Sequence, residues 1–159
     1  MFEKILVPLD GSEHSLKALE VATQIAKRFG SKVTLIHVYS IATGPAMMPE
    51  PTTLTPPGFP VMTSAEISKI TDAARRAGSR ILAEGEQKVK AEEVAVETML
   101  NEGHIVQEIV RTAQEGKFNL IVIGARGISH IRELLLGSTT DGVIHHATCP
   151  VLVIKPTPH

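Results

Sequence analysis

Five short apolar runs, rich in β-branched residues, alternate with segments of helical periodicity along this chain of 159 residues. Such runs are typical of strands buried on both faces, and a strand, a helix and another strand favour a right-handed crossover into a parallel sheet. The alternation therefore predicts an α/β fold, a three-layer sandwich with a five-stranded parallel sheet and helices on both faces. The expected strands are residues 4–9, 32–39, 93–100, 120–123 and 150–155.

The third run differs from the others because two kinds of side chain alternate in it. Val94, Val96 and Thr98 alternate with Ala95, Glu97 and Met99, which suits a less buried strand at an edge of the sheet. With the first strand central, the expected strand order is 3-2-1-4-5. The connections then reverse direction between strands 1 and 4, and open parallel sheets bind ligands beyond the carboxyl ends of the strands at such a point.

A glycine motif follows the fourth expected strand. Gly124, Ala125, Arg126 and Gly127 come directly after it, and nine residues later Gly137, Ser138, Thr139 and Thr140 open an expected helix over 138–146. Glycines let a ligand approach backbone amides, and amides with hydroxyls at a helix start hold anions such as phosphate. The motif therefore predicts a nucleotide site, although it is neither a Walker loop nor a dinucleotide fingerprint.

Other candidate residues lie at the ends of expected strands and in the glycine motif. Asp10 is a candidate partner for a ribose hydroxyl or for a metal carried by phosphates, or else it caps the next helix together with Ser12. Arg126 and His130 are candidate donors to phosphate. Val38 would form a wall for a base, and core packing explains it equally well. The pattern places no catalytic residue and no protein-held metal, so we expect binding rather than turnover.

Composition excludes several classes of partner. There are 16 Lys and Arg against 17 Asp and Glu, a net charge of −1, which gives no footprint for nucleic acid or an anionic membrane. No apolar run approaches the roughly 20 residues of a membrane span. One cysteine permits no intramolecular disulfide and fits a reducing compartment, so we expect a cytoplasmic protein.

The chain is expected to form one domain over residues 1–159, interrupted by a flexible proline-rich loop. That loop covers residues 40–62 and holds six of the ten prolines. After it, residues 63–66 have the form of a capping box that opens a long helix. The expected apolar face of this helix is formed by Ile67, Ile70, Ala74, Ala77 and Ile81.

The chain resembles the universal stress protein family over essentially its whole length. The resemblance rests on residues 5–12, on the Gly-x2-Gly-x9-Gly-Ser/Thr signature that starts at Gly124, and on residues 146–154. This signature is typical of the ATP-binding branch. The resemblance implies ATP as ligand, with Pro8, Asp10 and Val38 around the adenosine and the two parts of the glycine motif around ribose and phosphates. Any Mg²⁺ would come with the phosphates.

The resemblance also implies a homodimer formed through the C-terminal strand, residues 151–154. An uncovered apolar strand at a sheet edge gives this a physical motive, because it can pair with a second copy. The leading hypothesis is an ATP-binding stress-response regulator that acts through a protein partner. A slow ATPase or nucleotidyl-transferring enzyme, and a flavodoxin-type electron carrier, are the alternatives.

Overall fold

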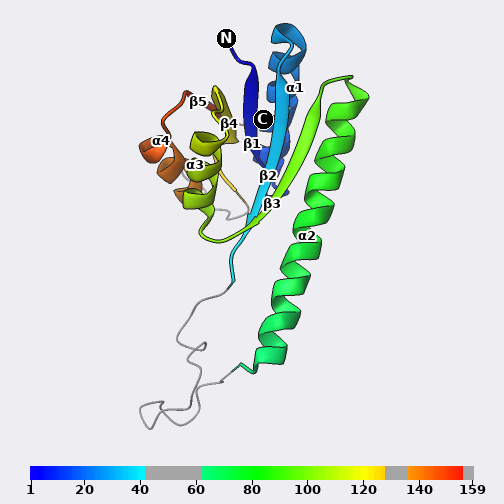
Figure 1. Ribbon diagram of the computed structural model, residues 1–159, viewed down its shortest axis with the longest axis vertical. Helices are drawn as coiled ribbons and strands as arrows, with labels where there is room; N and C mark the ends of the chain where they lie inside the picture. The colour runs from blue at the N-terminus through cyan, green and yellow to red at the C-terminus, as the bar shows by residue number, and fades with distance from the viewer. Residues whose placement is uncertain (42–61, 128–135, 156–159) are drawn as a thin grey trace.

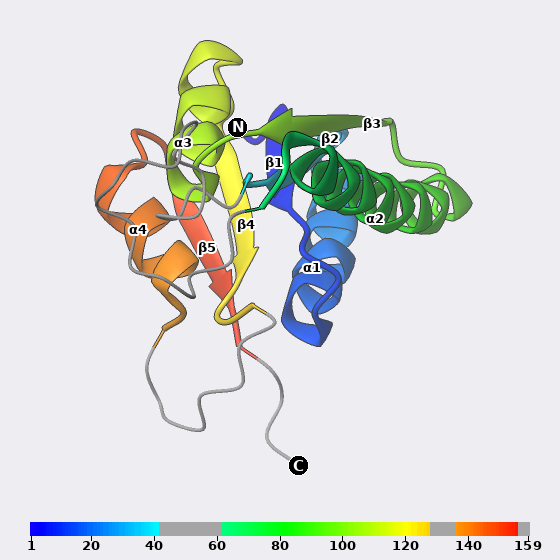
Figure 2. The same ribbon diagram turned by 90° about the horizontal axis from the view of Figure 1, so that it is seen from below.

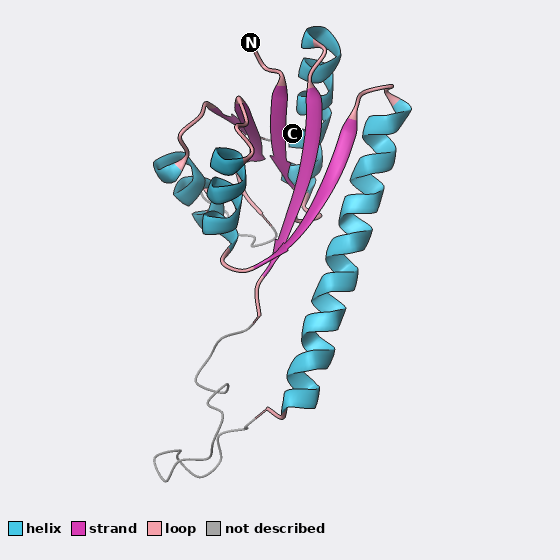
Figure 3. Ribbon diagram, in the orientation of Figure 1, coloured by secondary structure: helices cyan, strands magenta, loops and turns pink. Residues whose placement is uncertain are grey.

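The computed structural model describes residues 1–41, 62–127 and 136–155, in which strands and helices alternate (Figures 1 and 3). The elements are β1 (Lys4–Pro8), α1 (Glu13–Phe29), β2 (Lys32–Tyr39), α2 (Ser64–Ala91), β3 (Val96–Glu102), α3 (Ile105–Glu115), β4 (Leu120–Gly124), α4 (Ser138–His146) and β5 (Val151–Ile154).

The strands form one parallel sheet in the order β3-β2-β1-β4-β5. Its centre is β1, where Leu6 is in register with Thr34 of β2 and with Ile121 of β4. Viewed from below, α1 and α2 cover one face of the sheet, and α3 and α4 cover the other (Figure 2). The predicted fold class and strand order are confirmed.

Alternate residues of β1 supply the two halves of the core. Ile5 and Val7 belong to the cluster under α1 and α2, whereas Leu6 belongs to the cluster under α3 and α4. All three side chains are fully buried. Because successive side chains of a strand point to opposite faces, an apolar run without alternation is what a strand covered on both sides requires.

Helix α2 begins where the sequence predicts, and its predicted apolar face is partly buried: Ile67, Ala74 and Ile81 are half-buried. Thr63 and Glu66 form the reciprocal capping box. Ile70 is nevertheless 49% exposed and Ala77 is exposed. The first half of the helix extends past the carboxyl ends of the strands, beyond the sheet (Figure 1). The second half packs on the sheet through Ile81 of the predicted face and through four buried residues outside that face, Gly78, Leu82, Gly85 and Val89.

Strand β3 lies two to three residues later than predicted, at Val96–Glu102. The reason is the end of α2. Glu93 adopts a left-handed conformation with φ 58°, and the N–H of Val94 returns to the carbonyl of Val89. This is a Schellman-type helix end, in which glycine is the usual left-handed residue, so the glutamate gave no sign of it.

The ends of the predicted 40–62 loop are described, and its remainder lies outside the described residues. No described helix combines the length and the apolar character needed to cross a membrane.

Candidate functional site

A cavity of about 100 Å³ lies beyond the carboxyl ends of β1, β2 and β4, on the face that carries α3 and α4. This is the reversal point between β1 and β4 that the strand order predicts. Eight of the predicted site residues line the cavity: Pro8, Asp10, Val38, Gly124, Arg126, Gly127, Thr139 and Thr140.

Asp10 uses its two carboxylate oxygens differently. Oδ1 accepts a hydrogen bond of 2.9 Å from the N–H of Ser12, and the Ser12 hydroxyl in turn caps α1 by accepting from the N–H of Ser15. Oδ2 faces Gly127 so closely that a Cβ on that glycine would lie 2.5 Å from it. Asp10 therefore does support the start of α1, through Oδ1, while its Oδ2 lies at the cavity.

The turn after β4 is fixed at both ends by hydrogen bonds. The N–H of Ala125 donates to Ile154 at 2.8 Å, and the carbonyl of Ala125 accepts from the N–H of Gly137 at the same distance. The buried Thr140 hydroxyl donates to the carbonyl of Gly124 at 2.7 Å. These bonds join β4, β5 and the start of α4. The Thr140 hydroxyl thus holds the turn, and Thr140 also lines the cavity.

The start of α4 has no side-chain cap. Its N-cap residue is Gly137, which makes no side-chain hydrogen bond, in contrast to Ser12 and Thr63 at the starts of α1 and α2. The first N–H groups of a helix need acceptors, and the helix dipole favours an anion there. Thr139 is half-buried and lines the cavity, so this helix start borders it directly.

Three of the predicted site residues that the structure describes do not line the cavity. Ala125 is buried, and both of its backbone polar groups are already used. Gly137 and Ser138 lie at the start of α4 without lining the cavity. His130 lies outside the described residues.

An apolar wall of the cavity was missed by sequence reasoning. The wall comes from the last residues of the strands and the first turns of α3, and its unpredicted members are Leu9, Ile36, Ile105, Ile109 and Ile123. Ser15 of α1 is a further lining residue that was not predicted. Isoleucines and leucines at such places are indistinguishable from core residues in a sequence. The position of the cavity beyond the strand ends was the available signal.

The cavity is poor in groups that could hold a metal or act as nucleophiles. Asp10 supplies the one carboxylate among the described lining residues, and no cluster of three His, Cys, Asp or Glu suited to a metal occurs in the described parts of the chain. Burial raises the pKa of the Cys149 thiol, which disfavours its thiolate form. The pKa of Glu97 is lowered by hydrogen bonds from Lys32 and Thr34, outside the cavity.

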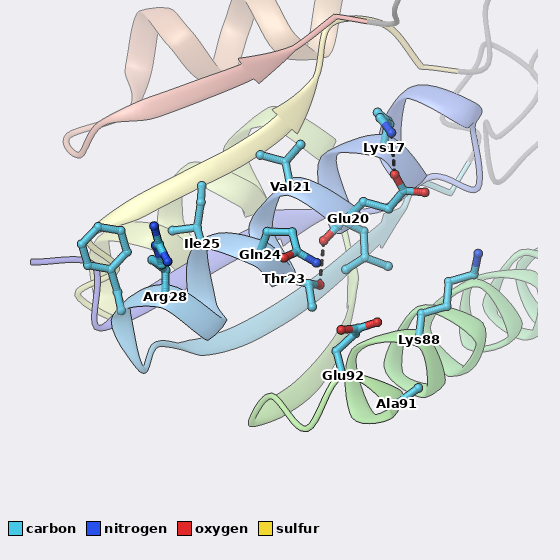
Figure 4. A pocket seen from close by; sticks show the side chains of 12 residues that line it. Lys17, Glu20, Val21, Thr23, Gln24, Ile25, Arg28, Lys88, Ala91 and Glu92 are labelled. Carbon is cyan, nitrogen blue, oxygen red and sulfur yellow. Dashed lines mark hydrogen bonds and ion pairs between the residues drawn. The ribbon is translucent and has the colours of Figure 1, made fainter.

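A wider groove of about 880 Å³ runs between α1 and the C-terminal end of α2 (Figure 4). It contains none of the glycine motif. Lys17 pairs with Glu20 at 2.6 Å, and Glu92 pairs with Lys27 at 2.7 Å, all roughly half-exposed. Such surface pairs contribute little and form no ligand site by themselves.

The model of the universal stress protein family matches residues 1–155. The chain belongs to this family. It is 34% identical over 155 residues to the universal stress protein YxiE of Bacillus subtilis, covering 98% of this chain and 100% of that one.

Solved structures of family members have the same fold. The universal stress protein UspA from Lactobacillus plantarum is 26% identical, with a TM-score of 0.79, over 96% of this chain and 97% of that chain. A universal stress protein solved in complex with cAMP is 25% identical, with a TM-score of 0.66, over 98% of both chains.

Proposed function

We propose that this universal stress protein binds an adenine nucleotide, with ATP as the preferred ligand, in the cavity beyond β1, β2 and β4. The observation that carries the proposal is the meeting at one cavity of Asp10 Oδ2, a Gly127 on which any Cβ would collide with that oxygen, and an uncapped α4. The complex of a family member with cAMP supports a nucleotide as the class of ligand.

The volume of the cavity favours one orientation of the ligand. About 100 Å³ is smaller than the roughly 300–1,000 Å³ of typical ligand pockets, so it suits a base rather than a whole nucleotide. We place the base against the apolar wall of Val38, Ile105 and Ile109. Asp10 Oδ2 then accepts from a ribose hydroxyl, and the phosphates lie over Gly127 and the first amides of α4. Mg²⁺ would arrive with the phosphates.

We further propose that the protein is a regulator in the cytoplasmic stress response. A binder regulates when the ligand has different affinities for two states, and this needs no catalytic group. Asp10 is the one carboxylate among the described lining residues, which supports binding over turnover. The nucleotide-dependent state would be read by a protein partner.

Calorimetry tests the ligand, and a phosphate-release assay tests turnover. We expect one ATP bound per chain, weaker binding of FMN, and no phosphate release above the buffer background. AMP and cAMP as further ligands report how much the terminal phosphates contribute. Absence of binding by ATP, AMP and cAMP alike would refute the nucleotide site, and steady phosphate release would favour the slow ATPase.

We also propose a homodimer formed through β5. This edge strand leaves Leu152 37% exposed, and Ile144 of α4 is 39% exposed. Light scattering should give about twice the 17.1 kDa mass of the chain. Leu152→Lys should shift it to the monomer mass, because a charge would be buried in the pairing edge. Ile70→Lys, at an exposed apolar site on α2, is the matched control and should remain dimeric.

A further inference from the structure

His37 lies in β2 next to Val38, but its side chain points to the opposite face of the sheet, under α2. Its Nδ1 lies 2.7 Å from the carbonyl oxygen of Leu9. A carbonyl only accepts hydrogen bonds, so Nδ1 must carry a proton and donate it. In the neutral ring the proton is therefore on Nδ1, and His37 binds the backbone immediately before Asp10.

Leu9 is consequently held from both sides. Its N–H donates to the carbonyl of Ile36 at 2.8 Å, which extends the pairing of β1 with β2 by one residue. Its carbonyl, which belongs to the peptide bond with Asp10, accepts from His37. Fixing this peptide plane fixes the direction in which the chain enters the turn, and hence where the Asp10 carboxylate lies relative to Gly127.

Gly78 of α2 provides the space for the imidazole ring. A Cβ on Gly78 would lie 2.4 Å from Cδ2 of His37 and 2.8 Å from Cδ1 of Leu100. Helix α2 can thus approach β2 closely only because this residue has no side chain. The ring is held between the helix and the Leu9 carbonyl, which leaves little room for it to rotate.

We infer that His37 is a positioning residue for the nucleotide, holding the Leu9–Asp10 peptide so that Asp10 Oδ2 faces the cavity, and that Gly78 of α2 keeps His37 in place. This inference rests on the proposed nucleotide site. It adds a residue outside the cavity on which affinity depends, and it makes α2 a contributor to the site.

Two substitutions of His37 with side chains of similar size separate the contribution of its hydrogen bond to nucleotide affinity from that of its shape. His37→Asn retains an N–H donor near the position of Nδ1, whereas His37→Leu has a similar shape without a donor. We expect His37→Leu to weaken ATP and AMP binding roughly threefold to tenfold, the usual weight of one hydrogen bond, and His37→Asn to restore most of the loss. Equal affinities of His37→Leu and the wild type would overturn the inference, as would equal losses in both variants.

A second measurement needs no variant. Nitrogen-15 NMR of the wild-type protein should show the neutral His37 ring protonated at Nδ1, the less common tautomer in water. A proton on Nε2 alone would overturn the inference even if a variant failed to fold. For the affinity measurements on the His37 variants, His145→Leu is the matched control. His145 makes a similar bond to the carbonyl of Asp141 at an exposed site, so this substitution should leave nucleotide affinity unchanged.

Gly78→Ala tests the contribution of α2. The added methyl should displace the ring and weaken nucleotide binding about as much as His37→Leu, although Gly78 does not line the cavity. Combined with His37→Leu it should add little further loss, because both variants break the same contact. If the wild type binds none of the nucleotides, the proposed function fails, whereas normal wild-type binding with unaffected variants rejects only the role of His37.

Discussion

Gly127→Val is expected to lower ATP affinity about 100-fold or more while leaving the fold intact. A Cβ at this position would lie 2.5 Å from Oδ2 of Asp10, so the carboxylate must move away from the place where we position the ribose. The two methyl groups of valine would also fill the path of the phosphates. Because Gly127 is half-exposed and lies outside the regular elements, stability should change by about 0.5 kcal/mol or less.

Calorimetry and thermal unfolding, measured on the same samples, check this expectation. Ala83→Val is the matched control, because it introduces the same side chain at an exposed position of α2 and should bind ATP normally. Near-normal ATP binding by Gly127→Val would show that the turn after β4 does not hold the nucleotide. A large loss of stability would show instead that Gly127 is needed for folding.

Gly124→Ala, unlike Gly127→Val, should cause a large loss of stability. A Cβ on Gly124 would lie 2.7 Å from the carbonyl carbon of His14 and 2.8 Å from its oxygen. These are backbone atoms of α1, which cannot turn away as a side chain can. We expect a loss of about 3 kcal/mol, seen as a melting temperature lower by roughly 10 °C.

Gly142→Ala provides the comparison for this result. The added methyl there meets the Val106 side chain at 2.9 Å, and that side chain can shift. Replacing glycine by alanine inside α4 also stabilises the helix by about 1 kcal/mol, which offsets part of the strain. A similar loss in both variants would mean that the close approach of α1 to Gly124 is not what makes a glycine necessary there.

The two positions of the turn thus require glycine for different physical reasons, which the sequence could not separate. In the motif they are equivalent, and both are expected to expose backbone to a ligand. In the structure Gly124 lets α1 approach β4, whereas Gly127 faces a carboxylate across the cavity. The distinction depends on which atoms lie opposite each residue, and this is set by packing between distant segments.

Most of the fold follows from local pattern, and the errors have local causes as well. Apolar runs located the strands because β1, β2 and β4 are covered on both faces. The face of α2 was predicted only in part, because the helix also packs through Gly78 and Gly85, which carry no hydrophobic signal, while Ile70 is exposed. The start of β3 was missed because Glu93 takes a conformation that usually identifies glycine.

The polar part of the candidate site was predictable, whereas its apolar and supporting parts were not. Asp10 and Gly127 follow strand ends, where topology alone indicates a ligand site. Ile105 and Ile109 read as the buried face of a helix, since a residue that lines a cavity and one that fills a core have the same chemistry. His37 gave no signal, because its bond to Leu9 joins two strands 28 positions apart.

The placement of β1 at the centre of the sheet has a consequence for synthesis on the ribosome. Strand β1 is made well before its neighbour β4, and the bond from the N–H of Lys4 to the side chain of Asn119 spans 115 positions. Contacts this distant form slowly, so a nascent chain keeps one edge of β1 open until β4 has been made.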